Sequence, residues 1–92
     1  MLSVIKSKKY QKSLKIYLRH ESFSIFKLEK IILLIQKQIP LDPAYRDHKL
    51  KGKLEGAREC HIYPNVLLIY KILEKELVLL LVDIGSHPKL LE

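Results

Sequence analysis

The feature that most constrains the fold is a change in the spacing of apolar residues near the middle of the chain. Apolar side chains over residues 25–39 recur every three or four positions, which is the period of one helix face. Residues 57–84 instead alternate or form short apolar runs, as strands do. Pro40 separates the two patterns, because proline cannot continue a helix. The sequence therefore predicts an α+β domain.

The individual elements follow from these patterns and from the turn residues between them. Serines near residue 24 are suited to cap a helix, and residues 40–56 hold two prolines, two glycines and many charges. We expect that segment to be a loop with room for a short strand. In chain order we expect a strand, two helices, a loop and three strands, over residues 2–6, 7–20, 25–39, 40–56, 57–63, 66–71 and 77–84.

The order β-α-α-β-β-β predicts two layers, with a helical hairpin packed on one face of a mainly antiparallel sheet. A chain of 92 residues has room for one core, so we expect a single domain over residues 1–92. Its longest aliphatic run, residues 77–82, is far shorter than the roughly 20 residues of a membrane span. The lone Cys60 excludes an internal disulfide and fits a reducing compartment. We expect a cytoplasmic protein that does not associate with membranes.

The net charge of +7 is large for this length and indicates a polyanionic partner such as RNA, DNA or an acidic protein. The basic residues form two groups. One group precedes the first acidic residue, Glu21, and its lysines are explained equally well by a helix face that is exposed to solvent. The second surrounds the central loop. The groups are Lys6, Lys8, Lys9, Lys12, Lys15 and Arg19, and then Arg46, Lys49, Lys51, Lys53 and Arg58.

Histidines are the candidate chemical groups. His20 falls at the end of the first expected helix, where a cation interacts favourably with the helix dipole, so a structural role explains it. His48, His61 and His87 lie in the C-terminal half at spacings of 13 and 26 residues, which match no compact zinc pattern. Cys60 and His61 are neighbours on a strand and point to opposite faces. We expect no metal site and no cofactor.

Alternation along residues 57–63 places Cys60 and Ile62 against the helices and Glu59, His61 and Tyr63 on the opposite, uncovered face. A single strand histidine is more often a solvated residue than a catalytic one. Three histidines, each within three residues of an arginine or lysine in a basic chain, favour cleavage of RNA. Histidine can take the proton of the attacking 2′-hydroxyl or protonate the leaving 5′-oxygen, each worth about 10²–10⁴ in rate. Cations would stabilise the transition-state charge.

The segments LDPAYRDHKLKGKLEGARECHIYPNVLLIYKI and LVLLLVDIGSHPKLL closely resemble the YafQ branch of the RelE-type bacterial toxins. The resemblance implies a RelE-like fold and cleavage of messenger RNA in the A site of the ribosome, in contact with ribosomal RNA. It implies that His48, His61 and His87 are catalytic, with His87 as general acid and the other two sharing deprotonation and charge stabilisation. It also implies RNA contacts from a basic and polar group, namely Lys49, Lys51, Lys53, Arg58 and Asn65.

Four positions depart from the family pattern. Asn65, Val66, Asp83 and Leu91 stand where relatives have an aspartate, an aromatic residue, a basic residue and a phenylalanine. We expect these changes to affect base stacking and sequence preference. Two alternatives stay open, a gyrase-binding inhibitor without enzymatic activity and an RNA-binding relative that has lost its toxicity. As a toxin, the basic chain should pair with an acidic, partly disordered antitoxin that folds on binding.

Overall fold

A computed structural model describes residues 1–86 of the protein. A five-stranded sheet has the strand order β1-β5-β4-β3-β2. β1 pairs in parallel with β5, and the other neighbours pair antiparallel. The elements are β1 (Ser3–Lys6), α1 (Lys8–Tyr17), α2 (Ile25–Gln36), the 3-10 turn η1 (Pro43–Tyr45), β2 (His48–Lys49), the 3-10 turn η2 (Gly52–Leu54), β3 (Arg58–Tyr63), β4 (Val66–Leu73) and β5 (Val78–Gly85).

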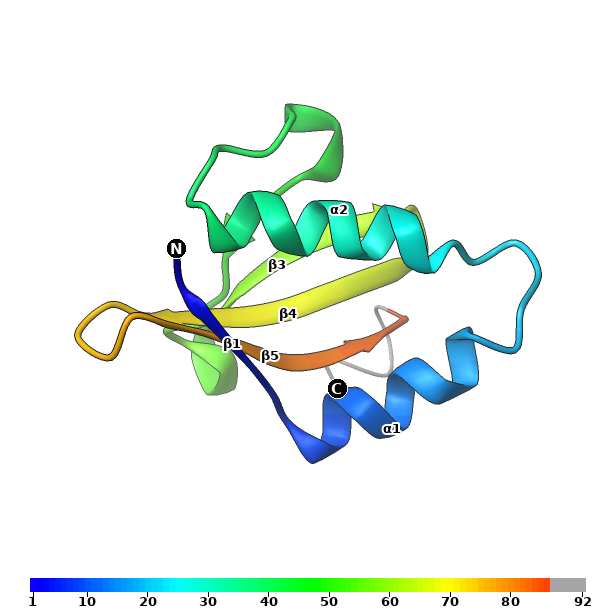
Figure 1. The fold of residues 1–92 in the computed structure, drawn as a ribbon, viewed down its shortest axis with the longest axis horizontal. Helices are drawn as coiled ribbons and strands as arrows, with labels where there is room; N and C mark the ends of the chain where they lie inside the picture. The colour runs from blue at the N-terminus through cyan, green and yellow to red at the C-terminus, as the bar shows by residue number, and fades with distance from the viewer. Residues whose placement is uncertain (87–92) are drawn as a thin grey trace.

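The two helices form one layer against this sheet. α2 lies across β3 and β4, and α1 runs beside β5 (Figure 1). Both contribute to one core, in which Tyr10 of α1 and Leu28 of α2 are buried with Cys60 and Ile62 of β3. The predicted two-layer α+β fold is therefore confirmed, as is the placement of Cys60 and Ile62 on the helix side. Within residues 1–86, no helix has the length and apolar character that crossing a bilayer requires.

Serine hydroxyls begin both helices. Ser7 Oγ accepts a hydrogen bond from the Tyr10 amide at 2.9 Å and donates to the carbonyl of Val82 in β5 at 2.7 Å. Ser24 Oγ caps α2 by accepting from the Lys27 amide at 3.2 Å. The caps satisfy amides that have no partner within the helix. The first cap also ties the start of α1 to the sheet.

The end of α2 differs from the prediction. The helix was expected to run to residue 39, but it ends at Gln36. The Gln38 amide bonds the Ile35 carbonyl at 2.8 Å, and the Ile39 amide bonds the Leu34 carbonyl at 2.9 Å. These bonds form a Schellman motif around Gln38, whose φ is 57°. The chain therefore leaves the helix before Pro40 is reached.

Tyr63 is the second correction. It was expected on the uncovered face with Glu59 and His61, but the register of β3 against β4 shifts between His61 and Tyr63. Its side chain packs against the core on the helix side, and its hydroxyl accepts a hydrogen bond from the Ser24 amide at 3.0 Å. A β-bulge reverses the alternation locally, and short-range sequence patterns do not reveal it. Glu59 does lie on the face opposite Cys60, but the prediction that it is uncovered there is wrong, because its side chain is fully buried.

Candidate active site

The pairing of β2 with β3 brings together two of the predicted catalytic histidines. His48 lies opposite Glu59 in the register, and alternation puts His61 on the same face as Glu59. One carboxylate oxygen, Glu59 Oε1, is 3.3 Å from His61 Nε2 and 3.8 Å from His48 Nε2. The side chains of His48 and His61 are 52% and 17% exposed, whereas that of Glu59 is 0% exposed. The result is a buried carboxylate between two accessible imidazoles.

Glu59 is the residue that the sequence reasoning did not single out. Neither of its oxygens has a hydrogen-bond partner among residues 1–86, so the two histidine nitrogens lie near Glu59 Oε1 without hydrogen-bond geometry. A buried carboxylate is costly unless charged or polar groups compensate it. Glu59 is therefore placed to stabilise the positive charge that either imidazole acquires on taking a proton. In the same described range, no three metal-ligating side chains are placed to hold an ion.

The backbone fixes which nitrogen of His48 can take that proton. His48 Nδ1 is 2.7 Å from the carbonyl oxygen of Arg46. Since a carbonyl only accepts, Nδ1 carries a hydrogen, and a neutral His48 has its lone pair on Nε2, the atom facing Glu59. Arg46 adopts the left-handed conformation, with a φ of 51°. This conformation is uncommon for a residue other than glycine, and here it directs the carbonyl to the histidine.

Arg58, predicted to contact RNA, points away from the histidine pair. It shares the helix-side face of β3 with Cys60, and its Nη2 bonds Asp47 Oδ2 at 3.0 Å. The Tyr70 hydroxyl donates to Asp47 Oδ1 at 2.5 Å. The hydrogen bond to Asp47 raises the pKa of Arg58 above its ordinary value. These contacts fasten the loop that carries Asp47 to the sheet, which is a structural role.

The other four predicted RNA contacts are also dispersed. Lys49 lies opposite Arg58 in the register and, with Lys51, lines a cavity of about 740 Å³ on the helix side. Lys53 is exposed on η2. Asn65 lies in the β3–β4 turn and lines a separate cleft beside the aromatic residues of that end. The structure does not gather these residues around His48 and His61.

The positively charged side chains that line a cleft together with His61 come from other segments. Lys27 of α2 and Arg46 of the loop line one cleft together with His61, and Tyr45 and Tyr63 also line it. Arg46 precedes His48 by two residues, so its proximity to a candidate histidine in the sequence could have identified it as a site residue. Lys27 is far from both histidines in sequence, and no local pattern connects it to them.

His87, the predicted general acid, lies outside the described residues, as does Leu91. The strand that leads toward His87 ends close to the histidine pair. In the register, Gly85 of β5 is opposite Leu67 of β4, and Leu67 is opposite His61 of β3. Two strand spacings amount to about 10 Å, so the backbone of Gly85 is about that far from the backbone of His61.

Asp83, one of the departures from the family pattern, is occupied by contacts with α1. It is buried, Ser13 Oγ donates to its Oδ1 at 2.7 Å, and Lys9 Nζ is 3.6 Å from its Oδ2. The acidic residue therefore serves the packing of α1 against β5. Val66 lies in the cleft of Asn65, beside the rings of Tyr17, Phe23 and Tyr63.

Comparison with known proteins identifies relatives over almost the whole chain. A family described as "Bacterial toxin of type II toxin-antitoxin system, YafQ" matches residues 2–92. The mRNA interferase toxin YafQ of Escherichia coli K12 is 35% identical over 85 residues, covering 91% of this chain and 89% of the relative. A metal-bound toxin from Helicobacter pylori is 43% identical, with a TM-score of 0.91 and coverage of 98% and 99%. YafQ in the E. coli DinJ–YafQ complex is 28% identical, with a TM-score of 0.85 over the full length of both chains.

Likeness of this extent in both sequence and fold defines the class as the small α+β toxins of bacterial toxin–antitoxin modules. The family match over residues 2–92 identifies one family within this class. The chain belongs to the YafQ family of type II toxins. The resemblance noted in the sequence is thereby confirmed.

Proposed function

We propose that this toxin is an mRNA interferase, an endoribonuclease that cuts messenger RNA on the translating ribosome without a metal ion or cofactor. The observation that carries the proposal is the buried carboxylate of Glu59 between His48 and His61. Two imidazoles around one carboxylate suit proton transfer, and the E. coli relatives are named mRNA interferase toxins. Cleavage of RNA by acid–base chemistry accounts for both the histidine–carboxylate cluster and the activity named for these relatives.

The reaction follows from the positions of the proton-carrying atoms. His48 Nε2, whose lone pair is fixed by the Arg46 contact, and His61 share removal of the proton from the 2′-hydroxyl. The 2′-oxygen then forms a bond to phosphorus, and the bond to the 5′-oxygen breaks. His87 gives its proton to that leaving oxygen. The upstream fragment ends in a 2′,3′-cyclic phosphate and the downstream fragment in a 5′-hydroxyl, and Glu59 stabilises the imidazolium formed in the first step.

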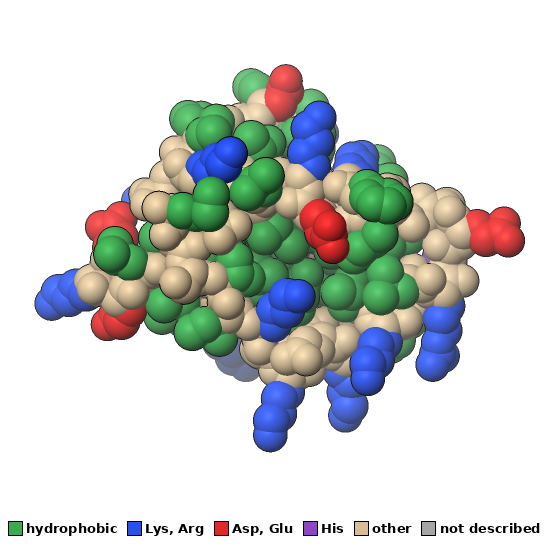
Figure 2. All heavy atoms as spheres, in the orientation of Figure 1, with side chains coloured by type: hydrophobic (Ala, Val, Ile, Leu, Met, Phe, Trp, Pro, Cys, Tyr) green, Lys and Arg blue, Asp and Glu red, His purple; other side chains and the backbone are tan. Residues whose placement is uncertain are grey.

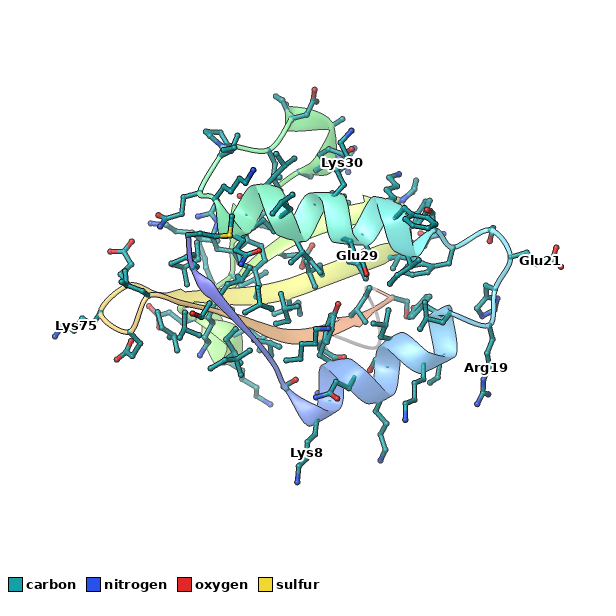
Figure 3. All side chains as sticks on the ribbon, viewed as in Figure 1. Lys8, Arg19, Glu21, Glu29, Lys30 and Lys75 are labelled. Carbon is teal, nitrogen blue, oxygen red and sulfur yellow. The ribbon has the colours of Figure 1, made fainter. Side chains whose placement is uncertain are left out.

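The basic surface of the chain supports a ribosomal location. Lys8, Lys9, Lys12 and Lys15 line one side of α1. Lys and Arg side chains project along that edge of the molecule (Figure 2), and Lys8 and Arg19 point away from its body (Figure 3). This surface binds the phosphate backbone of ribosomal RNA while the message occupies the A site. Such a reaction takes place in the cytoplasm.

A cognate antitoxin completes the proposal. The E. coli YafQ structures include complexes with DinJ. For the present chain, the net charge of +7 favours an acidic partner with a segment that folds on binding and covers the basic surface. The partner keeps the toxin from the ribosome.

The experiment measures cleavage of a defined message in a reconstituted translation system, with new 5′ ends mapped by primer extension. His87→Ala and the double variant His48→Gln/His61→Gln should lower cleavage by about 10²-fold or more. The single variants His48→Gln and His61→Gln should each lower it by less, because the other histidine can still accept the proton. His20→Gln, in the segment between α1 and α2, is the matched control and should cut as the parent does. Parental cleavage by correctly folded His87→Ala, or equal cutting with and without ribosomes, would contradict the proposal.

A further inference from the structure

A cleft beside His61 has features that the catalytic proposal does not use. β2 pairs only with Arg58 and Glu59, and among residues 1–86 the remainder of the β3 edge faces η1 instead of another strand. A cleft of about 450 Å³ lies here, within the size range of small-molecule sites. Its lining includes Lys27, Tyr45, Arg46, His61 and Tyr63.

The cleft combines aromatic and positively charged groups. Lys27 and Arg46 supply the charge, Tyr45 and Tyr63 supply the rings, and within residues 1–86 no acidic side chain contributes to the lining. Aromatic faces stack on bases of any sequence, and cations hold the phosphates. This composition fits a nucleotide better than an apolar ligand or a cation.

The two tyrosines are not equivalent. The ring of Tyr63 is already in contact with other groups, since Lys27 Nζ lies 4.1 Å from its centroid and the Phe23 ring centroid is 5.9 Å away. The ring of Tyr45 has no aromatic or cation–π partner in the described part of the chain, and it is half-buried at the cleft. Tyr45 is thus the ring that is available for stacking, and it is held by η1, whose first amide is capped by Asp42.

We infer that this cleft is the subsite for the nucleotide that supplies the attacking 2′-hydroxyl, with its base stacked on Tyr45 and its 3′-phosphate held by Arg46 and Lys27. The inference rests on the proposed ribonuclease function. His61 also contributes to the cleft lining, so we place the ribose of a nucleotide bound there beside this proposed base. Tyr45 then supplies the stacking surface that Val66 lacks.

The test uses the four nucleoside 3′-monophosphates, which carry the base and the 3′-phosphate of the upstream product. Each is titrated into the ¹⁵N-labelled parent protein and followed by NMR, with inorganic phosphate as the probe without a base. Amide shifts should centre on Tyr45, Arg46 and His61. Tyr45→Leu should weaken nucleotide binding by about 5- to 150-fold, as expected for loss of one base stack, and leave phosphate binding unchanged. Tyr45→Phe keeps the ring and should bind within about two-fold of the parent.

Tyr45 also packs on the core, so Arg46→Gln is a second variant that removes charge without removing buried surface. It should weaken binding of both phosphate and nucleotides. Shifts centred elsewhere, or parental nucleotide affinity in a folded Tyr45→Leu, would overturn the subsite. Binding that depends on Tyr45 in a chain that cuts no message would support the subsite while refuting the ribonuclease function, because binding is measured without turnover.

Discussion

Replacing Glu59 by methionine should raise the stability of the protein and lower its cleavage of messenger RNA. The carboxylate is fully buried, and its oxygens have no hydrogen-bond partner in the described residues. Exchange of a buried ion pair for apolar side chains of similar volume is often stabilising by about 1–4 kcal/mol, whereas removal of one partner is destabilising when it leaves the other charge buried. His48 and His61 retain access to solvent, so the substitution leaves no charge stranded in the core. We expect the free energy of unfolding of Glu59→Met to rise by about 1–3 kcal/mol at pH 7.

The assay is thermal and urea unfolding followed by circular dichroism. For a domain of this length, each kcal/mol shifts the midpoint of thermal unfolding by about 4–8 °C, so the rise is readily measured. Glu55→Met, at an exposed position, is the matched control and should change stability by less than about 0.5 kcal/mol. Message cleavage by Glu59→Met should fall. A lower unfolding midpoint for Glu59→Met would refute the reasoning, because it would mean that the histidine pair fully compensates the buried charge.

Two further predictions concern the framework around the site. Asp47→Ala removes the ion pair with Arg58 and the hydrogen bond from Tyr70, and should lower the free energy of unfolding by about 1–3 kcal/mol in urea titrations; an unchanged midpoint would show that the loop is held by other contacts. Burial raises the pKa of Tyr10 from 10.0 to about 12, so the folded state favours the neutral phenol. Its contribution to stability is complete below pH 10 and is lost as the pH rises toward 12; Tyr10→Phe should therefore lose stability less steeply over that range, and parallel pH profiles would contradict the assignment.

The order of the elements and the core face of β3 could be predicted because both depend on local periodicity. Cys60 and Ile62 are buried as alternation requires. The same alternation places Arg58 with Cys60, away from His61, so its separation from the histidines was available in the sequence. The resemblance to RNA-cutting toxins led instead to a role in RNA binding, whereas the structure ties Arg58 to Asp47.

The missed parts of the site depend on contacts between distant segments. Lys27 reaches the cleft of His61 only because α2 begins beside the end of β3. The burial of Glu59 follows from tertiary packing, and no short-range pattern distinguishes it from an exposed strand glutamate. The turn of Tyr63 toward the helices comes from a bulge in the β3–β4 pairing. Sequence patterns and the family resemblance predicted the three histidines, and tertiary packing determines what surrounds His48 and His61.

The chemistry of the cut ends tests the central claim most directly. Message fragments from the translation reaction are isolated, and their termini are identified by mass spectrometry. Attack by the 2′-hydroxyl, with histidines moving the protons, predicts a 2′,3′-cyclic phosphate or 3′-phosphate on the upstream fragment and a 5′-hydroxyl on the downstream fragment. A 3′-hydroxyl upstream with a 5′-phosphate downstream would contradict the account, because it requires water as the nucleophile.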